Sequence, residues 1–108
     1  MTWAELSPRE AIERLSELVV IDVRGEDEFE GRLGHVEGAK LVPLPDLEAR
    51  IAELPRSRAL LIVCRSGARS AKACALLEAH GFASLANLVG GMLAWNDEGL
   101  PVMAGTSP

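Results

Sequence analysis

The sequence predicts an α/β domain with a central, mostly parallel sheet flanked by helices. Short apolar runs alternate along the chain with segments in which apolar residues recur at helical spacing. The runs 18–21 and 59–63 contain no polar residue, which is typical of strands buried on both faces of a parallel sheet. Because parallel strands need crossover connections, the helical segments between them are expected to cover the sheet in right-handed turns.

Length, composition and charge limit the class of protein. The 108 residues suffice for one hydrophobic core, so we expect a single domain over residues 1–103 and a flexible tail over 104–108. The net charge of −5 argues against a nucleic-acid or anionic-membrane partner. The chain lacks both an apolar run of about 18 residues and a signal-peptide pattern, which predicts a cytoplasmic protein.

The first helix has a clear start signal. Ser7 is expected to be its N-cap, with Pro8 at the first helical position and Glu10 completing a capping box. The apolar face of this helix continues to Leu18, where the first buried strand begins.

The middle of the chain reads as short elements joined by loops. The first buried strand ends in the sequence 22–24, and a helical turn is expected around Phe29. Glycines within 31–38 mark a loop, and 41–42 reads as a brief strand. Asp46 is expected to be the N-cap of the next helix.

The second half repeats the strand-then-helix order. The strand 59–63 leads through a turn into an alanine-rich helix that Gly81 ends as a C′ glycine. A last strand is expected over 85–89, followed by a short helix carrying residues 92–95.

The turn between the strand 59–63 and its helix holds the residues best suited to chemistry. It reads Cys64-Arg65-Ser66-Gly67-Ala68-Arg69. A tight strand-to-helix turn directs free backbone N–H groups and the positive end of the helix dipole to one point, and glycine gives the turn its backbone freedom. These N–H groups and the two guanidinium groups should stabilise the thiolate of Cys64, which is the nucleophilic form of cysteine.

A simpler interpretation treats Cys64 as a small residue of the hydrophobic core. The positions of Arg65 and Arg69 favour a functional cysteine, because the helix dipole disfavours cations there unless an anion is bound. Cys74 lies within the following helix, too far from Cys64 for a disulfide, and is interpreted as a packing residue. No spacing of cysteine and histidine indicates a metal site.

Four stretches in series resemble the single-domain rhodanese family, over about residues 7–102. They are Asp22-Val23-Arg24 with Glu28-Phe29; Gly34-His35-Val36-Glu37-Gly38-Ala39; the turn Cys64 to Arg69; and Gly90-Gly91-Met92 to Trp95 with Gly99-Leu100-Pro101-Val102. Each stretch alone is weak, whereas the four in order are specific. The resemblance implies a rhodanese-like three-layer domain with a five-stranded sheet.

The resemblance also implies a sulfurtransferase, an enzyme that works through a persulfide on Cys64. It would take a sulfane sulfur from a small anionic donor such as thiosulfate and pass it to cyanide, a thiol or a protein acceptor. No cofactor is implied apart from the covalent persulfide. The turn agrees, because N–H donors and cations suit both a divalent anion and a persulfide anion.

The other residues of the turn are expected to bind the donor. Arg65 is expected to face solvent and attract anions, or to be a solvated surface charge. Ser66 is expected to donate a hydrogen bond to the bound sulfur or to cap the helix. With Gly67, Ala68 and Arg69, these residues form the predicted substrate-binding turn.

Supporting roles fall to residues near the turn. Asp22 and Cys64 both follow predicted strands, so both are expected at the carboxyl edge of the sheet, where ligands bind in such folds. Arg69 is expected to hold the turn by pairing with a carboxylate, with Asp22 as the candidate partner. His35 is interpreted as structural, with proton transfer as the lesser alternative, and Trp95 and Phe29 are expected in the core.

Two alternative functions fit part of the pattern. A cysteine phosphatase related to this fold has one residue more between its cysteine and arginine, to surround a phosphate. Here four residues separate Cys64 from Arg69 and position 70 is serine, which argues against phosphatase chemistry. A non-catalytic rhodanese-like binding module is the second alternative, and the intact Cys64 argues against it.

Overall fold

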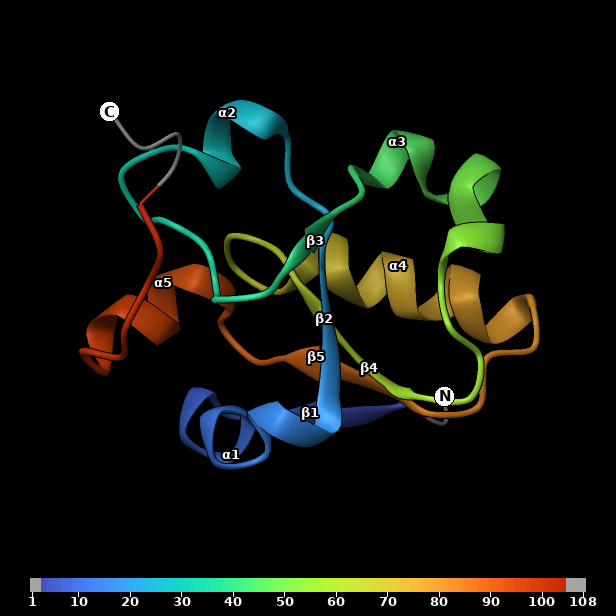
Figure 1. Ribbon diagram of the computed structural model, residues 1–108, viewed down its shortest axis with the longest axis horizontal. Coiled ribbons are helices and arrows are strands. Elements are labelled where there is room, and N and C mark those ends of the chain that lie inside the picture. The colour runs from blue at the N-terminus through green and yellow to red at the C-terminus, as the bar shows by residue number, and fades with distance from the viewer. Residues whose placement is uncertain (1–2, 105–108) are drawn as a thin grey trace.

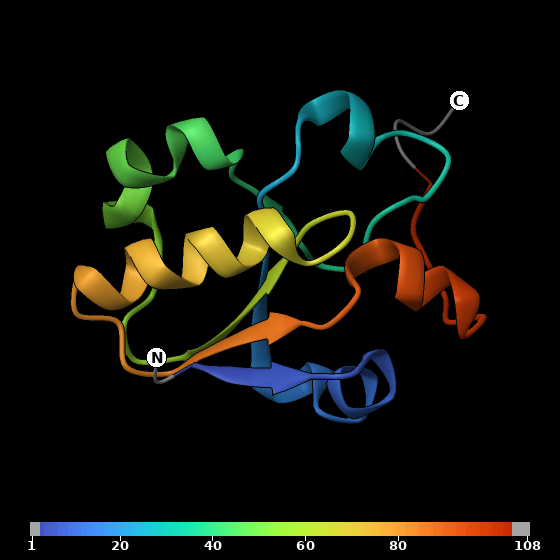
Figure 2. The ribbon, with the colours of Figure 1, turned by 180° about the vertical axis from the view of Figure 1, so that it is seen from behind.

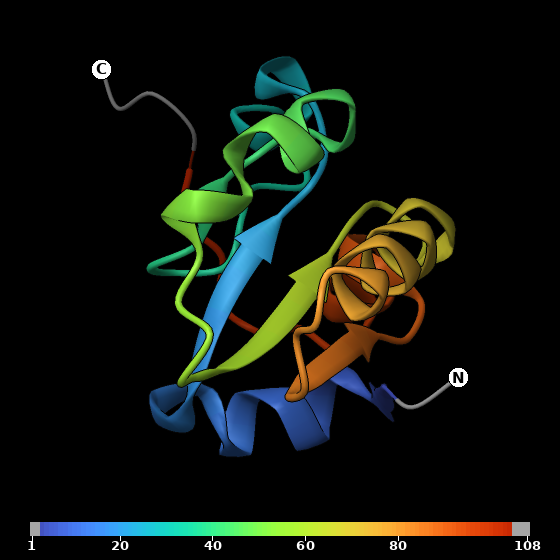
Figure 3. The ribbon, with the colours of Figure 1, turned by 90° about the vertical axis from the view of Figure 1, so that its right-hand side faces the viewer.

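Five strands form one sheet in the order β1-β5-β4-β2-β3, with every neighbouring pair parallel (Figure 1). The computed structural model describes residues 3–104. The strands are β1 (Ala4–Leu6), β2 (Leu18–Asp22), β3 (Lys40–Leu41), β4 (Ala59–Val63) and β5 (Leu85–Leu88). The arrowheads of β2, β4 and β5 point the same way in Figure 3. The predicted parallel sheet is therefore confirmed, as are the five strands that the resemblance implied.

Helices cover both faces of this sheet and make three layers. They are α1 (Pro8–Glu13), α2 (Glu26–Phe29), α3 (Leu44–Leu47), α4 (Ala68–Ala79) and α5 (Gly91–Asp97), with the 3₁₀ turns η1 (Leu15–Glu17) and η2 (Glu48–Glu53). Apolar residues of α3 and α4 pack on one face, and those of α1 and α5 pack on the other. Figure 2 shows α4 lying across β4 and β5, with the turn after β4 at its N-terminal end.

The central strand β4 contributes to both hydrophobic cores. Leu60 and Ile62 pack with residues of α4, whereas Leu61 and Val63 face α1 and α5. All four side chains are fully buried. A strand in this position must be apolar throughout, which is why 59–63 carries no polar residue.

The strand that the residue pattern did not predict is β1. It pairs with β5 at the edge of the sheet, and only Leu6 of its three residues is buried. Such a short strand leaves too little alternation of apolar and polar residues to be recognised. The strand expected over 41–42 begins and ends one residue earlier, and the strand expected over 85–89 ends one residue earlier.

Helix starts were predicted with mixed success. In α1 the Ser7 hydroxyl accepts from the Glu10 N–H at 3.1 Å and the Ser7 N–H donates to the Glu10 carboxylate at 2.9 Å, so the capping box is confirmed. Asp46 as an N-cap is wrong, because Pro43 takes that position and Asp46 lies within the first turn of α3. The Asp46 N–H donates instead to the carbonyl of Pro43, since proline fixes φ at a value suited to starting the turn.

The register of β2 and β4 places the predicted functional residues at one edge of the sheet. Asp22 is paired with Val63, the residue immediately before Cys64. The carboxyl ends of both strands therefore open onto the same region, as expected. Among residues 3–104, no helix is long and apolar enough to cross a membrane. The tail predicted to be flexible falls outside the described residues, apart from Ala104.

Candidate active site

The turn after β4 brings Cys64 to the N-terminal end of α4. Gly67 is the N-cap of α4 and has a φ of 104°, a conformation that only glycine adopts without strain. The turn is also held from behind by the start of α5. There the N–H groups of Met92 and Leu93 donate to the carbonyls of Cys64 and Arg65 at 2.9 and 3.0 Å. Two separate elements thus fix the backbone around the sulfur.

The Cys64 sulfur is surrounded by hydrogen-bond donors. The Gly67 N–H lies 3.0 Å from Sγ and the Ser70 N–H lies 3.3 Å away. The Ser70 hydroxyl oxygen is also at 3.3 Å, in a contact where either the hydroxyl or the thiol can be the donor. Burial raises the pKa of the thiol, but hydrogen bonds from Ser70, Gly67 and Ser66 outweigh it, so the pKa of Cys64 lies below its ordinary value. Donors aimed at sulfur favour the thiolate, as the sequence predicted for this turn.

Arg69 pairs with a carboxylate, but the partner is Glu28 and not Asp22. Its two Nη atoms donate to the two carboxylate oxygens of Glu28 at 2.7 and 2.8 Å. This two-point contact ties the first turn of α4 to α2, 41 residues earlier in the chain. The Arg69 guanidinium lowers the pKa of Glu28 from 4.5 to about 2.

The Asp22 carboxylate does not pair with Arg69 because it is already paired with the Arg24 guanidinium. The Arg24 Nε and Nη2 donate to Asp22 at 2.9 and 2.7 Å, and both residues are almost fully buried. The remaining donors of Arg24 reach the backbone carbonyls of Glu28 and Gly34 at 3.2 and 2.8 Å. Asp22 therefore supports the site indirectly: it fixes Arg24, which in turn holds α2 and the loop that follows it.

His35 holds the loop after α2. Its Nδ1 lies 2.9 Å from the Phe29 carbonyl, and its ring stacks on the Phe29 ring with centroids 3.7 Å apart. The backbone of His35 also pairs with that of Met103. These contacts fit the structural interpretation of His35. Phe29 is only half-buried, so its placement in the core was wrong, whereas Trp95 is buried as expected.

Comparison with known proteins decides the family. The model of the rhodanese-like domain matches residues 7–98. The chain belongs to the rhodanese-like domain family. It is 38% identical to a protein of Allochromatium vinosum named sulfurtransferase, over 82% of this chain and 80% of that one. It is also 38% identical to thiosulfate sulfurtransferase 18 of Arabidopsis thaliana, over 76% and 69% of the two chains.

Solved structures give the same family. The fold matches that of a rhodanese-related protein from Thermoplasma volcanium with a TM-score of 0.86 and 26% identity. The match covers 93% of this chain and 97% of that chain. The shared fold thus spans nearly the whole rhodanese-like domain.

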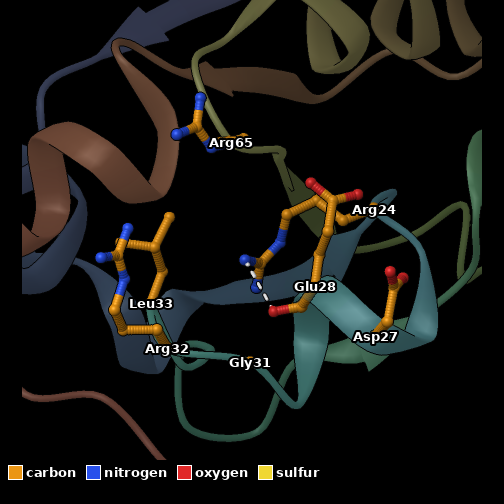
Figure 4. A pocket seen from close by; sticks show the side chains of 7 residues that line it. All are labelled: Arg24, Asp27, Glu28, Gly31, Arg32, Leu33 and Arg65. Atoms are coloured by element: carbon orange, nitrogen blue, oxygen red, sulfur yellow. Dashed lines mark hydrogen bonds between the residues drawn. The ribbon is translucent and has the colours of Figure 1, made fainter.

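An open cleft of about 200 Å³ lies beside the Cys64 turn of this rhodanese-like domain (Figure 4). Arg65, which is exposed as predicted, and Arg32 extend along one side of it, opposite Glu28. Neither of these two guanidinium groups has a hydrogen bond or ion pair within residues 3–104. Glu28 is already neutralised by Arg69, and Asp27 is the one other acidic residue of the lining, so the two free guanidinium groups leave the cleft with positive charge to offer an anion despite the net negative charge of the chain.

Several residues of the site were not recognised in the sequence. Ser70 was a usable signal, because it lies one helical turn after Gly67 and so faces the same side as the start of α4. Ser66 does not cap that helix, since Gly67 does, and Ser66 is exposed. Glu28 belongs to the first stretch that resembles the rhodanese family, but neither Glu28 nor Arg32 was assigned to the site, because only the tertiary fold brings them to the turn.

The second cysteine is a core residue, as predicted. Cys74 lies on the buried side of α4 and is fully buried, and burial raises the pKa of its thiol to about 12. Both cysteines are free. In the described part of the chain, no group of three or more histidine, cysteine or acidic side chains is placed to hold a metal ion.

The Arg69–Glu28 pair should make the stability of the domain depend on pH. Because the folded-state pKa of Glu28 is lowered to about 2, the contribution of the pair is present above about pH 4.5 and is lost as the pH falls toward 2. Glu28→Gln should be less stable than the native protein at pH 7, and the difference should shrink between pH 4.5 and 2. Urea unfolding at several pH values measures this, and a difference that stays constant would contradict it.

Proposed function

We propose that this protein is a sulfurtransferase with Cys64 as its nucleophile. The observation that carries the proposal is the set of N–H donors from Gly67 and Ser70 on the Cys64 sulfur, with the resulting lowered pKa. A thiolate stabilised in this way needs no histidine base. The names of the two relatives in Allochromatium and Arabidopsis support the same activity, and the second supports thiosulfate as the donor.

The reaction we propose has two displacement steps. The Cys64 thiolate first attacks the outer sulfur of thiosulfate, the sulfur–sulfur bond of the donor breaks, and sulfite leaves with its electron pair. A thiolate or cyanide then attacks the outer sulfur of the persulfide, and the electron pair of the broken bond returns to Cys64. Each step moves one sulfur atom, so no external oxidant, reductant, metal or cofactor is needed.

The free arginines of the cleft are suited to attract the anionic donor. Replacing Arg65 with alanine should raise KM for thiosulfate several-fold and change kcat much less, because the exposed guanidinium contributes attraction and not covalent chemistry. The effect should weaken as salt is raised, since exposed charges are screened over about 8 Å at physiological ionic strength. Steady-state kinetics at low and high salt measure both.

Arg58 provides the matched control for this prediction. It is exposed as well, but it precedes β4 and therefore lies at the opposite end of the strand from Cys64. Arg58→Ala removes the same charge and should leave KM unchanged. An equal rise in KM for the two variants would mean that overall charge, and not the cleft, attracts the donor.

The phosphatase alternative is weakened by the position of Arg69. Both of its Nη atoms donate to Glu28, so the paired donors that would grip a phosphate at two points are taken by a carboxylate. Intact-mass measurement after incubation with thiosulfate tests the proposal. We expect a gain of one sulfur atom, mapped to Cys64, that disappears on adding cyanide or excess thiol. Cysteine-dependent hydrolysis of an aryl phosphate without a persulfide would favour the phosphatase. The absence of both reactions would favour the non-catalytic binding module.

A further inference from the structure

A chain of polar contacts runs beneath Cys64 to the edge strand of the sheet. Ser70 and Asn87 are both buried, and the Ser70 hydroxyl donates to Oδ1 of Asn87. The Asn87 Nδ2 donates to the carboxylate of Glu5 at 3.2 Å and more weakly to the Gly67 carbonyl at 3.4 Å. Glu5 lies on β1, 82 residues away from Asn87 in the sequence.

The direction of each hydrogen bond in this series follows from the two acceptors at its far end. The Glu5 carboxylate and the Gly67 carbonyl can only accept, so the amide nitrogen of Asn87 must face them and its oxygen must face Ser70. The Trp3 indole N–H donates to the other carboxylate oxygen of Glu5 at 2.9 Å and so helps to hold it. The single hydroxyl proton of Ser70 is therefore directed to Asn87.

This arrangement decides what Ser70 offers to Cys64. With its proton on Asn87, the hydroxyl presents only lone pairs to the sulfur 3.3 Å away, which suits a thiol that donates its own proton. A thiolate has no proton to donate. To stabilise it, the Ser70 hydroxyl must turn its proton to sulfur and leave the buried Asn87 oxygen without that donor, which carries a cost.

We propose that Glu5 and Asn87 are positioning residues that hold the Ser70 proton away from the Cys64 sulfur. Ser70 then acts as a donor with two positions: on Asn87 when the sulfur carries a proton or a second sulfur, and on Cys64 when it is a thiolate. The link to turnover rests on the proposed function, because Cys64 becomes a thiolate each time the acceptor removes the outer sulfur. The effect on the acidity of Cys64 is independent of it.

Other charged groups around the turn are left unchanged by the test. They are Arg65 in the turn, Arg69 on α4, Asp22 at the end of β2, Arg24 just beyond it and Glu28 on α2. Glu5 itself faces Trp3 and Asn87 and also acts on the buried thiol of Cys74. Variants at position 5 therefore alter one charge and one hydrogen-bond direction.

Two variants of the exposed Glu5 separate these effects. In Glu5→Gln, the Trp3 N–H should hold the new amide oxygen, so that the amide nitrogen faces Asn87 and favours turning the Asn87 amide over. The Asn87 Nδ2 would then donate to Ser70, which frees the hydroxyl proton for the sulfur. Glu5→Ala removes the same charge without supplying a donor. We expect the pKa of Cys64 to be lower in Glu5→Gln than in Glu5→Ala by about half a unit.

The pKa is measured from the pH dependence of alkylation by iodoacetamide, with intact-mass detection and no sulfur donor present. Cys74 should not react, because its pKa is about 12 and it is fully buried. Equal pKa values of Cys64 in the two variants, or a higher value in Glu5→Gln, would overturn the proposal. The alkylation experiment does not test sulfur transfer, which the persulfide measurement tests separately.

Ser70→Ala supplies a further control. With the hydroxyl absent, Glu5→Gln and Glu5→Ala should give the same Cys64 pKa, because the series of hydrogen bonds from Glu5 no longer reaches the sulfur. A difference that persists without Ser70 would also overturn the proposal. If Ser70→Ala fails to fold, the comparison of the two Glu5 variants still decides, since Glu5 is exposed and its replacement leaves the core unchanged.

Discussion

Replacing Cys64 with alanine should reduce sulfur transfer to the uncatalysed rate and leave the fold intact. The side chain supplies the proposed attacking atom, and no other thiol is positioned at the turn. Cys64→Ser keeps an acceptor for the N–H groups of Gly67 and Ser70, but its hydroxyl is a far weaker nucleophile at neutral pH. Both variants should lose activity. Sulfur transfer to cyanide measures the activity, and circular dichroism checks the fold.

Cys74→Ala is the matched control for the loss of a buried thiol. It should keep most of the activity and lose on the order of 1 kcal/mol of stability from the small cavity left under α4. Cys74 lies in the core beside Leu77 and its thiol stays protonated at neutral pH. A folded Cys74→Ala variant as inactive as Cys64→Ala would show that the one-cysteine mechanism is wrong.

The fold and the turn were predictable because their causes are local in the sequence. A strand such as 59–63 must be apolar when both of its faces are buried, and a strand-to-helix turn with a positive φ requires a residue such as Gly67. The expected position of Cys64 at the start of α4 followed from these two facts alone. Geometry then added the number and direction of the donors around its sulfur.

The partners within the site were not predictable for the opposite reason. Asp22 and Glu28 are both acidic and close in sequence, and the pattern could not show that Arg24 occupies the first and leaves the second to Arg69. Asn87 was hidden in another way. It is the polar residue of the predicted strand 85–89 and was assigned no role, because its role depends on β1, which was too short to predict.

The charges of the site form two separate systems. The buried pair of Asp22 and Arg24 holds α2 in place, and the partly exposed pair of Glu28 and Arg69 joins α2 to the helix after Cys64. Together the two systems pair the carboxylates of Asp22 and Glu28. The guanidinium groups of Arg32 and Arg65 line the cleft without a partner among residues 3–104, and they are then free to act on an anion.

The buried pair should have the largest effect on stability. Replacing Arg24 with methionine removes the guanidinium from all of its partners. The fully buried Asp22 carboxylate is then left without its counter-ion. Breaking a buried ion pair on one side costs about 3–5 kcal/mol, which is a large share of the stability of a domain of this size. We expect urea unfolding to show a loss in this range. Sulfur transfer should fall as well, because α2 and its contact with Arg69 depend on Arg24.

A double variant identifies the cause of that loss. Asp22→Asn combined with Arg24→Met removes both charges, so no unpaired carboxylate remains in the interior and part of the lost stability should return. Asp22→Asn alone leaves the Arg24 guanidinium, whose bonds to the Glu28 and Gly34 carbonyls persist, and it should cost less than Arg24→Met. If the double variant is as unstable as the sum of the two single variants, the loss comes from packing and from the carbonyl contacts, and not from the stranded charge.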